Sequence, residues 1–398
     1  MEKYNQIYIQ KLSTSSVKER YLLISEGKYY EASSSVVQLL VCLQEKDTKE
    51  EAIIAYIGQS RNLFTPRQIE ELIDRCIVPI LENTEKKKRS FIYERELFSA
   101  ASIDRFTDIF RFLFYKNLMI PFIIIVLSLD IYFFYATENL LAINSSINAY
   151  TIVGLLVFML LSSLLHEVGH ASACKFFSVH HGQIGFGLYL NFPVLYTEVT
   201  EVWRLRRWQR CVVNIAGVYF QMYIAFVLLL FFFLTGSDII RYMLLLINFG
   251  FILTLNPFFK FDGYWIASDM LGVPNLRKRS QELLVYFFKS IGRKSQREKP
   301  YLLQVNCLGR YGLIVYSIVV NLFMGYYFFY ILPRFVISFI HSFPEEMNQL
   351  VLYLSNNMTP SFALLRNMAM QLLLLILMGI FVFNLVRALL GYAGKKQK

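Results

Sequence analysis

The sequence predicts a mainly α-helical, polytopic membrane protein with about six spans and a small N-terminal α+β domain of winged-helix-like pattern. The chain has 398 residues, of which 56% are hydrophobic and only 17% charged, whereas soluble domains carry about 25% charged residues. The apolar residues gather in runs of about 16 to 25, the length that crosses a hydrocarbon core of about 30 Å. The N-terminal residues lack such runs and alternate between strand and helix patterns instead.

Residues 1–85 form the predicted soluble domain. Segments 21–24 and 28–32 are predicted strands, and Ser25, Glu26 and Gly27 between them indicate a hairpin turn. Three helices are then expected to begin where capping residues precede apolar positions at helical spacing, near Ser33, Thr48 and Thr65. The order β-β-α-α-α is typical of a winged helix.

The remaining chain is predicted to divide into three parts. Residues 86–117 are a basic linker followed by an amphipathic segment at the membrane surface. Residues 118–275 form a membrane core, and residues 276–398 hold a basic cytoplasmic loop and two C-terminal spans. The six predicted spans are 118–137, 149–177, 211–235, 241–256, 312–332 and 368–390.

Basic residues indicate the orientation of these spans. They gather before the first predicted span, after the second, in segment 277–299 and in the C-terminal tail. The positive-inside rule therefore predicts a multi-pass protein of the cytoplasmic membrane with both termini in the cytoplasm. The net charge of +11 fits cytoplasmic loops on an anionic bilayer, so we expect the lipid bilayer and no nucleic acid as partner. The five cysteines show no C-x-x-C spacing, which makes a disulfide framework unexpected.

One motif predicts metal chemistry. His166-Glu167-Val168-Gly169-His170 matches the zinc-binding pattern H-E-x-x-H and follows the uncharged apolar run 150–165. Four helical residues turn about 400°, so His166 and His170 lie on one face and can bind one zinc ion. Glu167 lies beside the metal, where it can act as general base on zinc-bound water. Ionisable groups at membrane depth are costly and usually mark function.

A catalytic zinc needs a third protein ligand and one open position. Asp262 is the best candidate, because it follows a short predicted span that ends at Asn256-Pro257 on the same side of the membrane as the motif. Asp262-Gly263 is also a common turn sequence, and this alternative stays open from the residues alone.

These motifs together resemble the site-2 protease family of intramembrane zinc metallopeptidases. The likeness is strongest to the bacterial branch of peptide zinc metalloproteases, and it covers about residues 118–275. The resemblance implies one zinc ion held by His166, His170 and Asp262, with Glu167 as the catalytic base.

The resemblance also implies where a peptide substrate would bind. Ala216-Gly217 matches a small-residue position of the family's third core helix, but Val218 stands where proline is usual, and Gln221 is left to supply the polar group. The family pattern places a membrane-associated β-hairpin at residues 185–196, whose edge would hold an unwound peptide; an interfacial aromatic loop is the alternative. The substrate-binding candidates are Asn256, Gly217, Gln221, Gly185 and Tyr189.

Several other polar residues are candidate members of the site. Cys174 follows His170 by one helical turn and is either a rival ligand or a small buried side chain. His180 and His181 either approach the metal or form a solvated interfacial pair. Asp130 is a lone carboxylate in the first predicted span, with no role assigned beyond bonding within the helix bundle.

The N-terminal domain resembles the PqqD-like recognition domain of ribosomal peptide maturation systems. That resemblance implies binding of a precursor peptide by addition of a strand to the sheet. The leading hypothesis is therefore a zinc metalloendopeptidase that cleaves a precursor peptide during maturation or export, together with modification or secretion components. Two alternatives stay open: regulated intramembrane proteolysis of a signalling protein, and a non-catalytic zinc-containing adaptor of a peptide export system.

Overall fold

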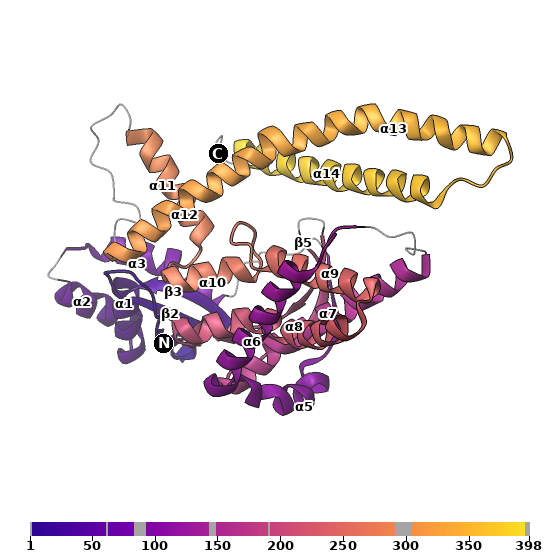
Figure 1. Cartoon of the computed structure of the whole chain (residues 1–398). Helices are drawn as coiled ribbons and strands as arrows, with labels where there is room; N and C mark the ends of the chain where they lie inside the picture. The colour runs from indigo at the N-terminus through magenta and orange to yellow at the C-terminus, as the bar shows by residue number, and fades with distance from the viewer. Residues whose placement is uncertain are drawn as a thin grey trace. The chain divides into compact units, whose positions relative to one another are not determined.

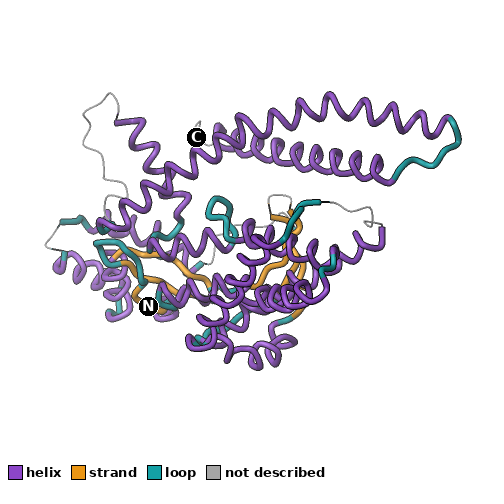
Figure 2. The backbone as a smooth tube through the Cα atoms, in the orientation of Figure 1, coloured by secondary structure: helices purple, strands orange, loops and turns teal. Residues whose placement is uncertain are grey.

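The computed structural model describes residues 2–60, 63–82, 93–142, 149–189, 192–290 and 305–394. The chain is mainly helical, with two small sheets (Figures 1 and 2). It divides into two compact units: residues 1–89, 95–186 and 195–314 form the first, and residues 90–94, 187–194 and 315–398 form the second. The predicted domain boundaries at 85, 117 and 275 stay predictions. The basic residues 86–89 lie outside the described residues.

The N-terminal sheet is antiparallel, in the order β1-β2-β3. Its strands are β1 (Tyr8–Lys11), β2 (Arg20–Ser25) and β3 (Lys28–Ser33). Glu26 and Gly27 both adopt positive φ at the β2–β3 turn, as a tight hairpin requires. The predicted hairpin is therefore present, and β1 is an additional strand that the sequence pattern did not reveal.

The three predicted helices are present and pack against one face of this sheet. They are α1 (Ser34–Glu45), α2 (Lys49–Gln59) and α3 (Pro66–Cys76), followed by the short α4 (Val78–Leu81). Thr48 and Thr65 cap α2 and α3 through their side chains, whereas Ser33 makes no side-chain cap at α1. Leu40, Leu43 and Ile73 are fully buried in the core that joins these helices to the sheet.

The candidate site is built on a second group of helices in the same unit. The first are α5 (Ala100–Phe110), the 3₁₀ turn η2 (Arg111–Phe114), α6 (Lys116–Ala136) and α7 (Ala149–Phe176). The turn η3 (Thr200–Arg204), α8 (Arg207–Thr235), α9 (Asp238–Thr254) and α10 (Asp262–Leu271) follow.

Helix α7 packs closely against α8. A Cβ on Gly169 of α7 would lie 2.4 Å from the carbonyl oxygen of Ala216 in α8, so the two backbones approach to a distance that only glycine allows at this point. Ala173, Val213 and Phe220 are buried around this contact. The close approach fixes the part of α7 that carries the H-E-x-x-H motif.

A second sheet, in the order β4-β5-β6, joins a strand that precedes α5 to a hairpin that follows α7. Its strands are β4 (Glu94–Phe98), β5 (Ile184–Tyr189) and β6 (Phe192–Thr197). The β5–β6 hairpin confirms the strand pair expected at residues 185–196, although its tip at residues 190–191 lies outside the described residues. Strand β4 corrects the expectation of a continuous amphipathic segment before the first span.

The C-terminal helices differ from the sequence expectation. They are α11 (Leu276–Ser290), α12 (Cys307–Tyr326), the π-helical turn η5 (Tyr327–Ile331), α13 (Leu332–Ser355) and α14 (Phe362–Gly394). Helix α13 was not predicted, and it lies beside α14 (Figure 1), with Gln371 Nε2 donating to Glu346 Oε1 across 3.2 Å. The basic segment that begins at residue 276 starts as a helix rather than as a loop.

Four helices of the described chain are long and apolar enough to cross a membrane. They comprise residues Lys116–Ala136, Tyr150–Phe176, Arg207–Thr235 and Phe362–Ile380. The six predicted spans are therefore not confirmed. The predicted fourth span corresponds to α9, which has only 17 residues, and the predicted fifth runs from α12 into η5.

Candidate metal centre

Helix α7 places three functional side chains of the motif within two turns. His166, Glu167 and His170 are 9%, 7% and 7% exposed. The two Nε2 atoms of His166 and His170 lie 3.1 Å apart, because residues four apart stack on one face of a helix. The local sequence is therefore sufficient to bring both imidazoles to one point.

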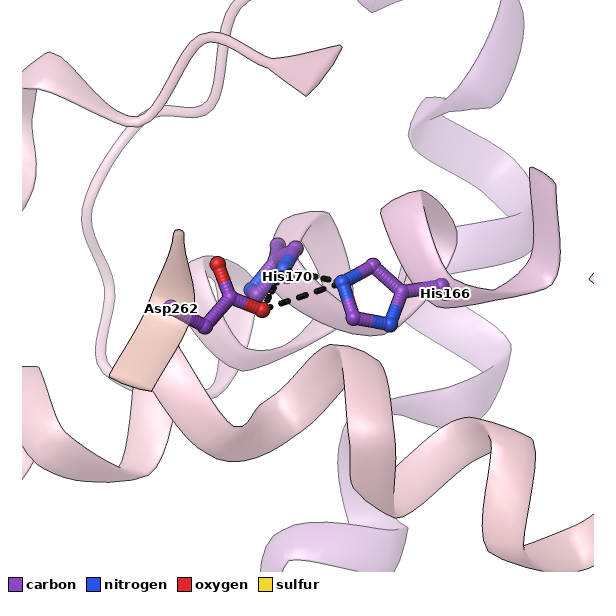
Figure 3. A group of neighbouring side chains, drawn as sticks. All are labelled: His166, His170 and Asp262. Carbon is purple, nitrogen blue, oxygen red and sulfur yellow. Dashed lines mark hydrogen bonds and ion pairs between the residues drawn. The ribbon is translucent and has the colours of Figure 1, made fainter. Parts of the chain in front are cut away.

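Asp262 reaches the same point from the first turn of α10 (Figure 3). Its Oδ2 atom lies 3.0 Å from Nε2 of His166 and 3.2 Å from Nε2 of His170. The tight connection after α9 makes this approach possible. Asn256 Oδ1 accepts the backbone N–H of Phe258 across 2.8 Å, and a Cβ on Gly263 would lie only 2.0 Å from the carbonyl oxygen of Leu255.

The three donor atoms fit a zinc ion. A tetrahedral zinc with bonds of about 2.0–2.1 Å holds its ligand atoms about 3.3 Å apart, close to the 3.0–3.2 Å between these atoms. Asp262 Oδ2 is buried and makes no hydrogen bond of ordinary geometry, which is costly unless a cation binds it. Burial alone raises the pKa of Asp262, but the charges of the neighbouring His170 and His166 lower it well below the usual range.

The remaining ring nitrogens of both histidines have partners. Nδ1 of His170 lies 2.7 Å from the carbonyl oxygen of Val213. Nδ1 of His166 lies 3.2 Å from Oε1 of Gln221, whose Nε2 donates to Ser162 Oγ across 2.9 Å. Such contacts fix the tautomer of a metal-binding histidine and leave Nε2 free for the metal.

Glu167 is held by a residue from the β-hairpin. The hydroxyl of Thr197, the last residue of β6, lies 2.7 Å from Glu167 Oε2 and 3.0 Å from the Glu167 carbonyl oxygen. The contact orients the carboxylate and ties the end of the hairpin to the motif. Sequence reasoning missed Thr197, because only the fold brings it to Glu167 across 30 residues.

The described residues among the predicted substrate-binding positions make different contacts. Asn256 shapes the turn before α10, and Gln221 contacts His166. Gly217 faces the His166 ring, where a Cβ would lie 2.3 Å from Nε2. Gly185 makes room for the ring of Tyr196, which lies 2.7 Å from the position of a Cβ.

Tyr189 is the last residue of β5, and its side chain lies outside the described part of the chain. A substrate role for these five residues stays a prediction. Structural contacts already account for four of them.

The other candidates lie apart from the three ligands. Cys174 is fully buried among the apolar residues between α7 and α8, as its alternative reading predicted, and it does not belong to the His-His-Asp group. His180 is exposed, whereas His181 is 2% exposed, with Nε2 lying 3.3 Å from Asp104 Oδ1. A solvated pair is therefore wrong for His181. Asp130 accepts a hydrogen bond from Asn248 of α9 across 2.9 Å, which joins two helices of the bundle.

Comparison with known proteins gives one relative. The chain is 26% identical over 141 residues to the Bacillus subtilis protein named "Putative peptide zinc metalloprotease protein YydH". The aligned region covers 35% of this chain and 56% of the relative, so the chain spans about half the length of the curated relative it matches. No protein-family model matches the chain. No solved structure matches it.

Proposed function

We propose that this protein is a zinc metallopeptidase of the membrane and that it cleaves a peptide at the His166–His170–Asp262 centre. The observation that carries the proposal is the meeting of two histidines of α7 with Asp262 of α10 at 3.0–3.2 Å, beside Glu167, whose carboxylate is held by Thr197. The name of the Bacillus subtilis relative supports the same chemistry. Four apolar helices of sufficient length support a membrane location.

Each residue has a distinct part in this reaction. His166, His170 and Asp262 hold the metal, which when bound lowers the pKa of a water and polarises the scissile carbonyl. Glu167 accepts the proton of the attacking water and passes it to the leaving amine. Thr197 orients the Glu167 carboxylate, and Gln221 and Val213 orient the histidine rings. A pure binding site needs no base beside its ligands, so the presence of Glu167 favours an enzyme over an adaptor.

The substrate is proposed to be an extended peptide held on the second sheet. A peptide bond in a helix is shielded by its own backbone, so the substrate must unwind before the bond reaches the metal. Strand β5 lies between β4 and β6, and β6 is an outer strand that ends at Thr197 beside Glu167. An added strand along β6 would satisfy the peptide backbone and lead it toward the catalytic base.

The N-terminal domain is proposed to recruit the precursor peptide. Its three-stranded sheet has two outer strands, β1 and β3, and addition of a peptide strand to such an edge is a common mode of peptide recognition. The helices of this domain pack against one face of the sheet through buried apolar side chains. Precursor maturation or export is the proposed context, with modification or secretion components as partners.

The direct test is substitution of Glu167 by Gln in the full-length protein. The variant is expected to keep zinc, because no ligand is changed, and to lose cleavage, because the amide cannot accept the proton. Zinc content is measured by mass spectrometry of the purified membrane protein. Cleavage is measured by comparing the peptides released by cells that carry the wild-type protein or the variant.

Glu201→Gln serves as the matched control, since Glu201 lies in η3 and its carboxylate accepts the backbone N–H of His180 rather than a contact from the metal centre. It should behave as the wild-type protein. Full peptide maturation by the Glu167→Gln variant would contradict an enzymatic role and leave the adaptor hypothesis. A cleaved regulator of transcription among the released peptides would instead favour regulated proteolysis.

A further inference from the structure

A buried ion pair outside the metal centre joins α8 to the helix that carries the third ligand. Arg210 and Asp269 are 3% and 6% exposed. Nε of Arg210 donates to Asp269 Oδ1 across 2.6 Å, and Nδ2 of Asn214 donates to Oδ2 across 3.0 Å. Two charges buried at this depth are costly unless they are well paired and hydrogen-bonded. Within the described part of the chain, the hydrogen bonds of this pair go to residues other than the three proposed metal ligands.

Asp269 and Asp262 lie on the same face of α10. They are seven residues apart, which is two helical turns and about 10 Å along the helix. The hydrogen bonds of Arg210 and Asn214 to Asp269 therefore restrict both the rotation of α10 about its axis and its position along that axis. The direction of the Asp262 carboxylate depends on both. The backbone oxygen of Asp269 also accepts Nε of Arg207 across 2.9 Å, which adds a second link to α8.

The same guanidinium reaches the N-terminal domain. Nη2 of Arg210 donates to the carbonyl oxygen of Ser13 across 3.2 Å. Ser13 belongs to the connection between β1 and β2, which we call the strap (residues 12–19). Arg210 therefore bonds the ligand helix and the strap at once.

The strap also forms hydrogen bonds with the C-terminal end of α10. The N–H and Oγ of Ser15 donate to the carbonyl oxygen of Gly272 across 2.9 and 3.1 Å. Gly272 ends α10 at a φ of +66°, and a Cβ there would lie 2.7 Å from the backbone nitrogen of Ser15. No residue with a side chain fits at this contact without displacing the strap.

Apolar side chains of the N-terminal sheet also pack near α10. Leu12, Leu22 and Ile24 form a buried cluster with Trp203 of η3. Trp203 meets the ring of Trp265 in α10 at 6.3 Å, and Arg210 lies over Trp203 at 5.3 Å. One face of the N-terminal sheet therefore packs against Trp203, which in turn contacts Trp265 of α10. The other face packs on the helices of the N-terminal domain itself.

We propose that Arg210 is a positioning residue for the metal centre and that the N-terminal strap, through Ser13 and Ser15, completes the support of Asp262. The N-terminal domain is then part of the structure that holds the zinc site, besides any recruitment of peptide. This inference rests on the proposed function only in assuming that the His-His-Asp centre binds zinc.

The test is the zinc affinity of the full-length protein in detergent, measured by competition with a chromophoric chelator. The double variant Arg210→Met/Asp269→Leu removes both buried charges and should stay folded, because apolar replacement of a buried pair is often neutral for stability. Its zinc dissociation constant is expected to rise about 10- to 100-fold, as for other residues that support metal ligands. Ser15→Ala removes only the hydrogen bond from Ser15 Oγ to Gly272, and it is expected to raise the zinc dissociation constant about three- to fivefold.

Arg241→Met/Asp238→Leu is the matched control. Arg241 is also buried and lies 2.8 Å from an aspartate, the partly exposed Asp238, but it is in the first turn of α9 and donates to the carbonyl oxygens of Asn139 and Ala142. The zinc affinity of this control variant should equal that of the wild-type protein. Arg210→Lys keeps the positive charge and should retain more zinc affinity than Arg210→Met.

Zinc affinity within twofold of wild type in both the Arg210 double variant and Ser15→Ala would overturn the inference, provided that His166→Ala loses zinc. Absence of zinc binding in the wild-type protein would instead overturn the proposed function itself.

Discussion

Gly217 of α8 lies against the His166 imidazole of α7 with no room for a methyl group. A Cβ on Gly217 would lie 2.3 Å from both Cε1 and Nε2 of the ring. Contacts below 3.0 Å essentially never occur for a real Cβ, so the ring or the helix would have to move. Since Nε2 is the proposed metal-binding atom, Gly217 matters for the geometry of the site.

Substitution of Gly217 by Ala is therefore expected to cost most of the zinc affinity, about 10-fold or more. The added methyl group displaces the His166 ring from Asp262 and His170. Gly154→Ala is the control, because Gly154 lies in α7, the helix that carries His166, with nothing within 4 Å of its Cβ position. Equal zinc affinity in the two variants would show that His166 does not depend on this contact.

Substitution of Gln221 by Leu should weaken zinc binding by about 10- to 100-fold. The change removes the hydrogen bond to Nδ1 of His166, so the ring loses both its orientation and its preferred tautomer. Ser162→Ala removes only the support of Gln221 and is expected to have a smaller effect. If Gln221 acts on substrate instead, zinc affinity will stay at the wild-type value while KM rises.

Thr197→Val is expected to lower kcat by about 10-fold with unchanged zinc content. The loss follows because the Glu167 carboxylate is no longer held by the threonine hydroxyl at 2.7 Å, and misplacement of a catalytic group by about 1 Å is costly. Thr197→Ser retains the hydroxyl and should recover most of the rate. A Val variant with normal turnover of peptide would exclude an orienting role for Thr197.

Asp104 predicts a pH dependence of stability. The hydrogen bond from Lys175 lowers the pKa of Asp104 below its ordinary 3.8, so ionised Asp104 stabilises the fold above that pH and the contribution is lost as the pH falls through the lower folded-state value. Asp104→Asn should therefore reduce the melting temperature at pH 6 and have a smaller effect at pH 3. Because the Asp104 side chain is 41% exposed, the difference will be modest. An equal decrease of the melting temperature at pH 6 and pH 3 would contradict this electrostatic account.

The sequence predicts those parts of the site that depend on local geometry. His166 and His170 lie four residues apart, so helix geometry alone brings them together. Asp262 is 92 residues beyond His170, and it was predicted from its place after a short span and from the resemblance. The capped helices α2 and α3 were predictable for the same local reason, since Thr48 and Thr65 mark their first turns.

The remaining features depend on contacts between segments that are distant in the chain. Strand β4 is exposed at every residue, so no apolar alternation marked it, and its place in the sheet comes from pairing with β5. Helix α13 contains Pro344, Glu345 and Glu346, which interrupt the apolar pattern. The contacts of Gln221 and Gly217 with His166 cross between two helices, and no pattern within α8 specifies them.

X-ray absorption at the zinc edge of the purified, zinc-loaded protein tests the central claim most directly. The three proposed ligands predict a first shell of nitrogen and oxygen only, at about 2.0–2.1 Å, with the outer-shell scattering of two imidazole rings. His180→Ala should leave this spectrum unchanged, whereas His170→Ala should remove one ring from it. A sulfur scatterer at about 2.3 Å, as Cys174 would supply, or a shell without imidazole would contradict the account.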